Sequence, residues 1–232
     1  MTLKISGLRK SFGDLPVLDG VDLEVGRDEI LALAGPSGCG KTTLLNLAAG
    51  LLRPGAGRVE TGGARVGYLF QEDRLLPWLT VAENIAAAGE AAEAGEAADL
   101  IRRVGLEGFA ERYPDEISGG MRQRVAMARA LHFHCGLLLL DEPFKSLDPG
   151  LRLEMLDLLL AIRRERRCPI LFVTHELDEA LAAANRLAIL SRRPARVLAC
   201  LDLGKTAARR DPAAPALSGV RRRALELLAG GG

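Results

Sequence analysis

The sequence has few of the features that mark a secreted or membrane-spanning protein. Its 232 residues include only four cysteines. They are Cys39, Cys135, Cys168 and Cys200, and none of the spacings is typical of a disulfide framework or a zinc site. The N-terminus "MTLKISGLRK" lacks the apolar segment of a secretory signal, and no apolar run approaches the ~18 residues of a membrane-spanning helix. These absences predict a reduced, cytoplasmic protein that does not itself cross a bilayer.

The sequence also lacks an excess of either charge. It has 31 Lys and Arg against 30 Asp and Glu, for a formal net charge of +1. Proteins built to coat nucleic acid usually have a strong basic excess, so nucleic acid is not an expected partner. Hydrophobic residues make up 48% of the chain, which is enough for a substantial core in a protein of this length.

Three short apolar runs each end in a group of polar residues. They are "ILALA" (Ile30–Ala34), "LLLL" (Leu137–Leu140) and "ILFV" (Ile170–Val173). Unbroken apolar runs of this length are typical of parallel strands buried on both faces of a sheet. Because ligands of such sheets bind beyond the carboxyl ends of the strands, the polar groups predict a site at that edge.

The rest of the chain suggests one domain and a tail. Residues 2–29 alternate in the manner of strands, whereas residues 71–134 are rich in Ala and Glu and show no strand pattern. We therefore expect a domain over residues 1–204, with a helical subdomain inserted at about 72–135. Residues 205–232 are expected to form a C-terminal tail with a short helix.

The first polar group, "GPSGCGKT" (Gly35–Thr42), fits the phosphate-loop pattern G-x-x-x-x-G-K-[ST]. Its glycines let the backbone wrap around phosphate oxygens in conformations that larger residues avoid. Lys41 would reach the β- and γ-phosphates, and the Thr42 hydroxyl would bind Mg²⁺. The alternative is a plain glycine-rich turn, but the motif follows a predicted strand and begins a predicted helix, as a phosphate loop does.

Polar side chains at three other strand ends suit the same chemistry. Of Asp141 and Glu142, one would hold Mg²⁺ and the other would polarise an attacking water. Gln71 could bind a metal or a water, and His175 could hydrogen-bond a terminal phosphate. The alternatives are a solvated carboxylate pair and two ordinary surface residues.

A second helix start with phosphate-binding character lies in "ISGGMRQRV" (Ile117–Val125). Ser118 is placed as an N-cap, and Gly119 and Gly120 leave backbone N–H groups exposed at the positive end of a helix. An ordinary helix cap would have the same sequence. A protein that binds one nucleotide has no evident need for two such helix starts.

In this order the motifs resemble those of the ATPase subunit of ATP-binding cassette (ABC) transporters, over residues 3 to about 196. The signature segment "ISGGMRQR" (Ile117–Arg124) and "SLD" (Ser146–Asp148) are part of the resemblance. It implies an α/β fold: a P-loop NTPase (RecA-like) core with an N-terminal antiparallel β section and a helical subdomain. It also implies an ATPase that uses ATP and Mg²⁺.

In that family two subunits pack head to tail, and each ATP lies between the phosphate loop of one and the signature segment of the other. The resemblance therefore implies that Phe12 stacks on adenine and that Ser118, Gly119 and Gly120 meet the γ-phosphate of the partner's ATP. It assigns phosphate and Mg²⁺ binding within one subunit to Gly35, Ser37, Gly38, Cys39, Gly40, Lys41, Thr42 and Thr43.

The resemblance also separates the roles of the remaining polar residues. Glu142 becomes the catalytic base, and His175 contacts the γ-phosphate. Asp141 and Gln71 serve the Mg²⁺, together with Thr42, and Gln71 also serves the attacking water. Asp148 would line the seam of the dimer.

Departures from the family pattern are mild. Ile117 replaces a usual leucine, Met121 a usual glutamine, and Lys145–Ser146 a smaller pair. Met121 and the segment "FQEDRLLPWLTVAENI" resemble the importer branch for nitrate, sulfonate and taurine. That branch implies a second copy of the chain and separate permease subunits as partners, with an extracytoplasmic solute-binding protein as an indirect one.

The implied location is the cytoplasmic face of the membrane, as a peripheral subunit. Residues Arg74–Thr80, with the only tryptophan at Trp78, are a candidate docking patch for the permease; packing within the helical subdomain is the alternative. The sequence leaves the solute open, since the other subunits select it, and does not decide between a homodimer and a heterodimer.

Two other classes remain as alternatives. Soluble ABC ATPases that act on nucleic acid or ribosomes typically carry long coiled-coil insertions or two cassettes, whereas this chain has one cassette and a short helical insertion. An ordinary P-loop kinase would give the signature segment, Gln71 and His175 no purpose.

Overall fold

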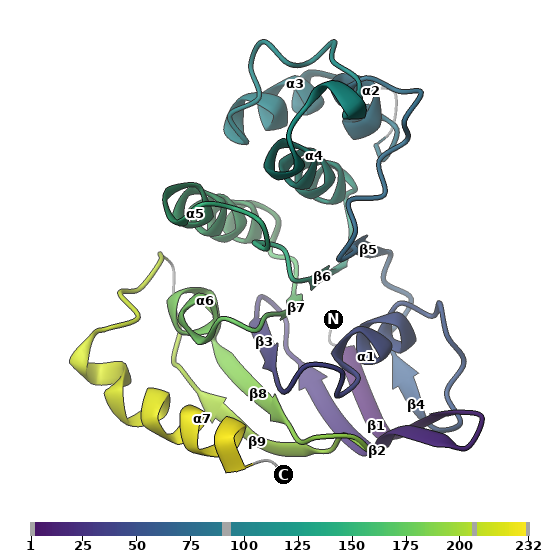
Figure 1. The fold of residues 1–232 in the computed structure, drawn as a ribbon, viewed down its shortest axis with the longest axis vertical. Helices are drawn as coiled ribbons and strands as arrows, with labels where there is room; N and C mark the ends of the chain where they lie inside the picture. The colour runs from purple at the N-terminus through teal and green to yellow at the C-terminus, as the bar shows by residue number, and fades with distance from the viewer. Residues whose placement is uncertain (1–2, 90–93, 206–207, 231–232) are drawn as a thin grey trace.

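The computed structural model describes residues 3–89, 94–205 and 208–230, and it contains two sheets (Figure 1). The smaller sheet is antiparallel in the order β2-β1-β4. Its strands are β1 (Leu3–Phe12), β2 (Leu15–Val25) and β4 (Ala56–Glu60). The larger sheet is parallel except for its last strand and has the order β5-β6-β7-β3-β8-β9. Its strands are β5 (Val66–Leu69), β6 (Leu137–Asp141), β7 (Ile170–Val173), β3 (Ile30–Ala34), β8 (Arg186–Leu190) and β9 (Val197–Asp202).

The three predicted strands lie next to one another in the middle of the large sheet, as β6, β7 and β3. Side chains alternate between the two faces of a strand, so a strand buried on both faces has an unbroken apolar sequence. In β3, Ile30 and Ala32 belong to one hydrophobic cluster, while Leu31 and Leu33 belong to the other. Burial on both faces is therefore the physical reason for the apolar runs.

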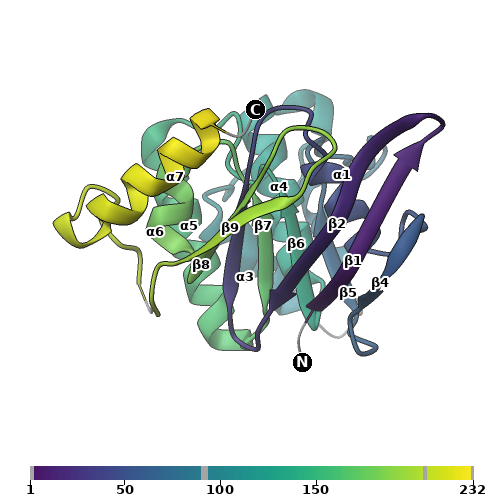
Figure 2. The same ribbon diagram turned by 90° about the horizontal axis from the view of Figure 1, so that it is seen from below.

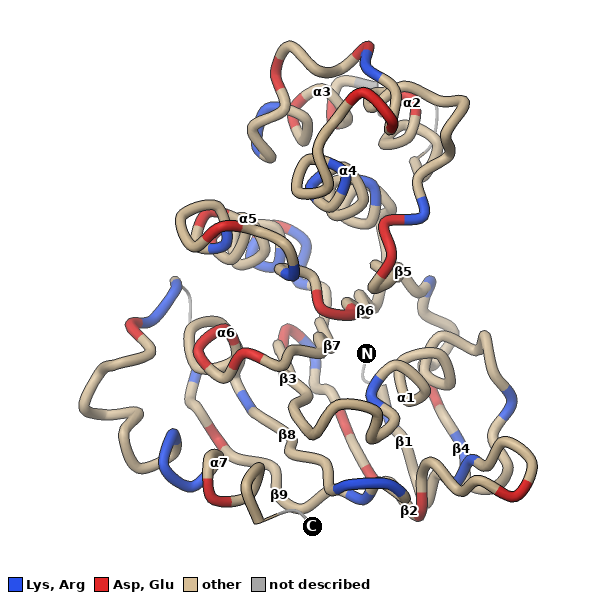
Figure 3. The backbone as a smooth tube through the Cα atoms, viewed as in Figure 1, with Lys and Arg blue, Asp and Glu red and all other residues tan. Residues whose placement is uncertain are grey.

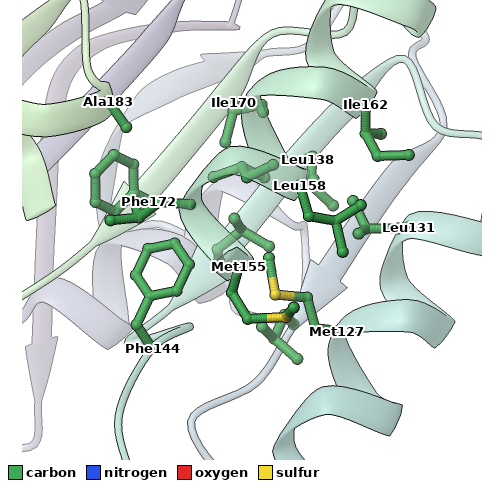
Figure 4. Packing of buried hydrophobic residues seen from close by; sticks show 14 of the residues in the cluster. Met127, Leu131, Leu138, Phe144, Met155, Leu158, Ile162, Ile170, Phe172 and Ala183 are labelled. Carbon is green, nitrogen blue, oxygen red and sulfur yellow. The ribbon is translucent and has the colours of Figure 1, made fainter. Parts of the chain in front are cut away.

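Helices cover the sheet from both sides. The helices are α1 (Lys41–Ala48), α2 (Val81–Ala86), α3 (Ala94–Arg103), α4 (Gly119–His132), α5 (Pro149–Arg166), α6 (Leu177–Ala183) and α7 (Ser218–Gly230), with 3₁₀ turns η2 (Pro114–Glu116) and η3 (Pro215–Leu217). The small sheet and α1 pack on one face, and α4, α5 and α6 share the cluster on the other. In that cluster Met127 of α4 and Met155 of α5 lie side by side, and beside them are Phe144 and Phe172, whose rings meet edge to face with centroids 6.4 Å apart (Figure 4).

The expected helical insertion contains α2, α3 and α4, which stand apart from α1 and the small sheet (Figure 1). Helix α2 begins with a capping box, in which the Thr80 hydroxyl accepts from the Glu83 N–H and the Glu83 carboxylate accepts from the Thr80 N–H. Outside residues 90–93, which are not described, the segment from 72 to 135 contains no strand. The exact domain boundaries stay a prediction.

Strands β8 and β9 were not anticipated from the sequence. They complete the large sheet, and α7 packs along this edge (Figure 2). The expected C-terminal helix at residues 216–228 is present as the end of η3 and most of α7. None of the described helices is both long enough and apolar enough to span a membrane.

The fold brings together two cysteines that are 33 residues apart in sequence. All four cysteines are free thiols, and the Sγ atoms of Cys135 and Cys168 lie 3.7 Å apart. The hydrogen bond between them lowers the pKa of Cys135 to about 7 and raises that of Cys168. Burial raises the pKa of Cys39, and partial desolvation of the thiol raises that of Cys200, although Cys200 is an exposed residue.

We expect iodoacetamide labelling of Cys135 to rise as the pH passes 7, because only the thiolate reacts and it forms above the pKa. Labelling of Cys200 should rise only at a pH above that at which an ordinary cysteine thiol ionises, because its pKa is raised. Mass spectrometry of peptides labelled between pH 5.5 and 9.5 measures both curves. Superimposable curves for the two cysteines would contradict the prediction.

Candidate functional site

A cleft of about 810 Å³ lies at the carboxyl edge of the large sheet. Its walls come from the small sheet and from the loops that follow β3, β5, β6, β7 and β8. The lining residues are Phe12, Leu15, Val17, Ser37, Gly38, Gly40, Lys41, Thr42, Thr43, Gln71, Asp141, Glu142, Lys145, His175 and Arg193. The structure thus brings the polar groups of all three predicted strands, and Gln71, to one place.

The loop between β3 and α1 has the backbone that a phosphate loop requires. Gly38 has φ 72° and Gly40 has φ 118°, in the region that glycine favours. A Cβ atom at Gly40 would lie 2.8 Å from Cγ1 of Val17, so no larger residue fits there. Lys41 is buried, and its Nζ donates to the carbonyl oxygens of Gly35 and Pro36 at 2.8 and 2.9 Å. The lysine therefore lies folded over its own loop.

Asp141 ends β6 and is 1% exposed. Burial raises its pKa, and a hydrogen bond from the Thr42 side chain opposes that shift. Its Oδ2 atom is buried and has no hydrogen-bond partner among the described residues. This unpartnered carboxylate oxygen and the neighbouring threonine hydroxyl are together suitable ligands for Mg²⁺. Mg²⁺ takes few protein ligands and completes its coordination shell with phosphate oxygens and waters.

Glu142 directly follows the last residue of β6, and Figure 3 shows acidic residues at this end of the strand. Its backbone is left-handed, with φ 50°. The Gln71 amide donates to Oε2 at 3.3 Å, the Lys145 ammonium lies 3.3 Å from the same oxygen, and His175 Nδ1 lies 3.7 Å from Oε1. These three contacts hold a carboxylate at the cleft that is able to take a proton from a bound water.

Phe12 lies at the other wall of the cleft, where it and Leu15 are about half exposed. Lys10 Nζ lies 5.2 Å from the centre of the Phe12 ring. This wall offers a flat apolar surface, as stacking on an adenine ring requires.

Several predicted site residues lie outside the cleft. Ser118 caps α4, accepting from the Met121 N–H at 3.3 Å, and is exposed, as is Gly119. A Cβ atom at Gly120 would lie 3.5 Å from the Ser146 carbonyl, so this helix start adjoins the "SLD" segment rather than the phosphate loop. Figure 1 shows α4 and α1 well separated. Within one chain, the two helix starts do not form a common site.

Three further predicted residues also do not line the cleft. Gly35 packs closely under the loop, where a Cβ atom would lie 3.1 Å from Leu190. Cys39 is buried beneath the loop. The carboxylate of Asp148 caps α5, accepting from the Leu151 N–H at 3.0 Å.

Two charged residues of the cleft, Lys145 and Arg193, were not among the site residues predicted from the sequence. Lys145 departs from the family pattern, and the resemblance therefore assigns it no role. Arg193 follows β8, whose sequence "RLAIL" is a fourth apolar run that ends in polar residues. Applying the strand-end argument to this run as well would have found it.

Comparisons with known proteins agree with this geometry. Residues 18–145 match the family described as ABC transporter. The aliphatic sulfonates import ATP-binding protein SsuB 1 of Pseudomonas savastanoi pv. phaseolicola is 44% identical over 207 residues, which cover 88% of this chain and 87% of that protein. SsuB of Bacillus licheniformis is 44% identical over 211 residues, 85% of this chain and 83% of that protein.

Two solved structures are similar over 88% of this chain and 100% of their own. One is a dimeric bacterial ABC transporter cassette, with a TM-score of 0.78 and 27% identity. The other is a dimeric ATP-binding cassette in a post-hydrolysis state bound to ADP and Pi, with a TM-score of 0.78 and 26% identity.

Proposed function

We propose that this chain, which belongs to the ABC transporter family of ATPases, powers the import of a small sulfonate-type solute. The observation that carries the proposal is the identity with SsuB import subunits over most of both chains. Nitrate and taurine are the other solutes of the branch that the sequence resembles. The family assignment makes the chain an ATP-binding ATPase, and the choice of solute is the part that needs a test.

The cleft supports a role for each of its polar groups in ATP hydrolysis. Lys41, Thr43 and the backbone of the phosphate loop would bind the phosphates, and Phe12 would stack on the adenine. Glu142 would accept the proton of the attacking water, which Gln71 orients. His175 would hydrogen-bond the γ-phosphate.

Mg²⁺ is the metal that the cleft suits. Thr42, Asp141 and Gln71 would hold it, and the buried, unpartnered Oδ2 of Asp141 is the observation that favours this. The ion would supply positive charge against the β- and γ-phosphates. The charge of Lys41 would act on the same oxygens once its amine leaves the loop carbonyls.

The exposed signature segment favours a head-to-tail dimer. Ser118, Gly119 and Gly120 present a helix N-terminus to solvent, away from the cleft of their own chain. A second copy would place this helix start against the γ-phosphate in the cleft. ATP would then favour the closed dimer because it contacts both subunits, and hydrolysis would remove those contacts.

Permease subunits are the proposed membrane partners, which would make the chain a peripheral protein at the cytoplasmic face. An extracytoplasmic solute-binding protein would deliver the solute to them. Trp78 is 69% exposed and Pro77 is exposed, whereas Leu75 packs against the core and Leu76 is half-buried. The outer half of Arg74–Thr80 is therefore available for docking.

Uptake of a radiolabelled alkanesulfonate tests the proposal. Deletion of the gene in its own host should abolish this uptake, and the wild-type gene but not Lys41→Ala should restore it. Nitrate uptake in the same strains serves as the comparison. Unchanged alkanesulfonate uptake in the deletion strain would overturn the assignment of the solute.

A further inference from the structure

We infer that Arg193 is a positioning residue of the ATP site, which fixes the phosphate loop through the Gly38 carbonyl and raises the affinity for nucleotide. The inference rests on the proposed function, since it concerns the same cleft. Arg193 belongs to none of the nucleotide-binding motifs of the sequence. It reaches the cleft from the loop after β8.

The contact between Arg193 and the loop is made by two donors. Both Nε and Nη2 of Arg193 donate to the carbonyl oxygen of Gly38, at 3.1 and 2.5 Å. On the other side of the same peptide group, the Cys39 N–H donates to the Pro36 carbonyl at 3.2 Å. The peptide between Gly38 and Cys39 is thus held at its oxygen and at its nitrogen. This peptide follows Gly38, whose backbone is left-handed with φ 72°.

The segment that carries Arg193 is itself firmly supported. The Ser191 N–H donates to the Arg196 carbonyl at 2.9 Å, and the Arg196 N–H donates to the Ser191 hydroxyl at 3.0 Å. Ala195 is buried and pairs with β2, donating to the Val17 carbonyl at 2.8 Å and accepting from the Asp19 N–H at 3.0 Å. Because β2 also packs against Gly40 through Val17, the segment and the phosphate loop share one support.

The charge of Arg193 suits an anion in the cleft. A guanidinium has five N–H donors, and the Gly38 carbonyl engages only two of its nitrogens. The other cations that line the cleft are engaged with the protein, Lys41 with two carbonyls and Lys145 with Glu142. The Arg193 guanidinium therefore covers the Gly38 carbonyl oxygen, which would otherwise repel a phosphate. It also places a positive charge beside the cleft, which would attract a phosphate.

The proposed role of Arg193 concerns the affinity for nucleotide and not the hydrolytic step. Arg193 contacts the phosphate loop and, among the described residues, makes no hydrogen bond or ion pair with Glu142, Gln71 or His175, the groups proposed to surround the attacking water. Its loss should release the loop and weaken nucleotide binding, while the hydrolytic groups keep their arrangement. The Michaelis constant for ATP should then change much more than kcat.

The neighbouring arginine provides a matched control. Arg192 is exposed like Arg193, belongs to the same segment and carries the same charge, but it does not line the cleft. Arg192 lies beside the outer side of the phosphate loop, and Arg192→Ala therefore removes the same charge from the same turn while both hydrogen bonds from Arg193 to the Gly38 carbonyl stay in place. Arg193→Lys keeps the charge but loses the paired donors, so it separates the two contributions.

The test is calorimetric titration of the purified full-length chain with MgADP, together with steady-state ATP hydrolysis. We expect Arg193→Ala to weaken ADP binding roughly tenfold and to raise KM for ATP similarly, with kcat within about twofold, the effect of losing one charge-assisted contact. Arg193→Lys should fall between Arg193→Ala and wild type. Arg192→Ala should match wild type.

Two results would overturn the inference while leaving the proposed function intact. One is wild-type ADP affinity in Arg193→Ala when Lys41→Ala has lost binding. The other is a loss in kcat with KM unchanged. A wild-type chain that binds no ADP would instead overturn the proposed function. If Arg193→Ala fails to fold, the comparison of Arg193→Lys with Arg192→Ala decides the question in the same way.

Discussion

Glu142→Gln is expected to lower kcat for ATP hydrolysis by about 10²–10⁴-fold, the range associated with removal of a general base. Glutamine has the shape of glutamate and still accepts the hydrogen bond from Gln71, but it takes no proton from water. Nucleotide binding should persist, because Glu142 has no part in the phosphate loop. Release of phosphate from ATP, measured beside calorimetric binding of MgADP, separates the two effects.

Glu176→Gln is the matched control for this prediction. Glu176 also lies beside His175, at 3.6 Å from Nε2, but it does not line the cleft. The control variant should hydrolyse ATP within about twofold of wild type, in the range of surface substitutions. Equal activity in the Glu142 and Glu176 variants would remove Glu142 from the role of base.

Ser118→Arg is expected to reduce ATP hydrolysis by at least about 10²-fold while leaving ADP binding to the isolated chain unchanged. The expected loss is of the size that follows removal of a preorganised donor from a developing charge. An arginine at this exposed N-cap would fill the space between two copies, yet it lies outside the cleft of its own chain. The same activity and calorimetric measurements apply.

Mixing two inactive variants tests whether the site is shared. A dimer of Ser118→Arg with Lys41→Ala has one cleft in which both the phosphate loop and the facing signature segment are intact. Mixing equal amounts should restore hydrolysis to at most about a quarter of the wild-type rate, the value for random pairing, in which half of the dimers are hybrids and each hybrid has one complete site. Lys41→Ala mixed with the double variant Lys41→Ala/Ser118→Arg should restore none. Equal rates in the two mixtures would show that each chain works alone.

The central strands of the fold were predictable from the sequence, because a strand that is buried on both faces consists of consecutive apolar residues. Strands β3, β6 and β7 are buried on both faces and so are unbroken apolar runs. Strand β9 lies at the edge of the sheet and alternates between half-buried and exposed residues, and β8 begins with the half-buried Arg186. Strands β8 and β9 are therefore harder to recognise from their residue composition than the three central strands are. The proximity of Cys135 and Cys168 follows from the pairing of β6 with β7, and no spacing in the sequence encodes it.

The candidate site was predictable wherever a side chain follows a central strand. The phosphate loop, Asp141, Glu142 and His175 all lie at the carboxyl ends of β3, β6 and β7, where the sheet order brings them together. Arg193 was not predicted, because β8 was not recognised as a strand in the sequence. The turn after β8 places Arg193 beside the phosphate loop. The signature segment differs from these residues, because in the described part of a single chain it does not line the cleft that contains the phosphate loop. Its proposed purpose came from a family resemblance and requires a second copy.

The central claim is that ATP binds between two copies of this chain. The most direct test is the solution mass of Glu142→Gln, measured by size exclusion with light scattering, with and without Mg-ATP. The proposed shared site predicts a monomer without ATP, a dimer with ATP, and a monomer under both conditions once Ser118→Arg is added. A monomer throughout, with wild-type hydrolysis per chain independent of protein concentration, would contradict it.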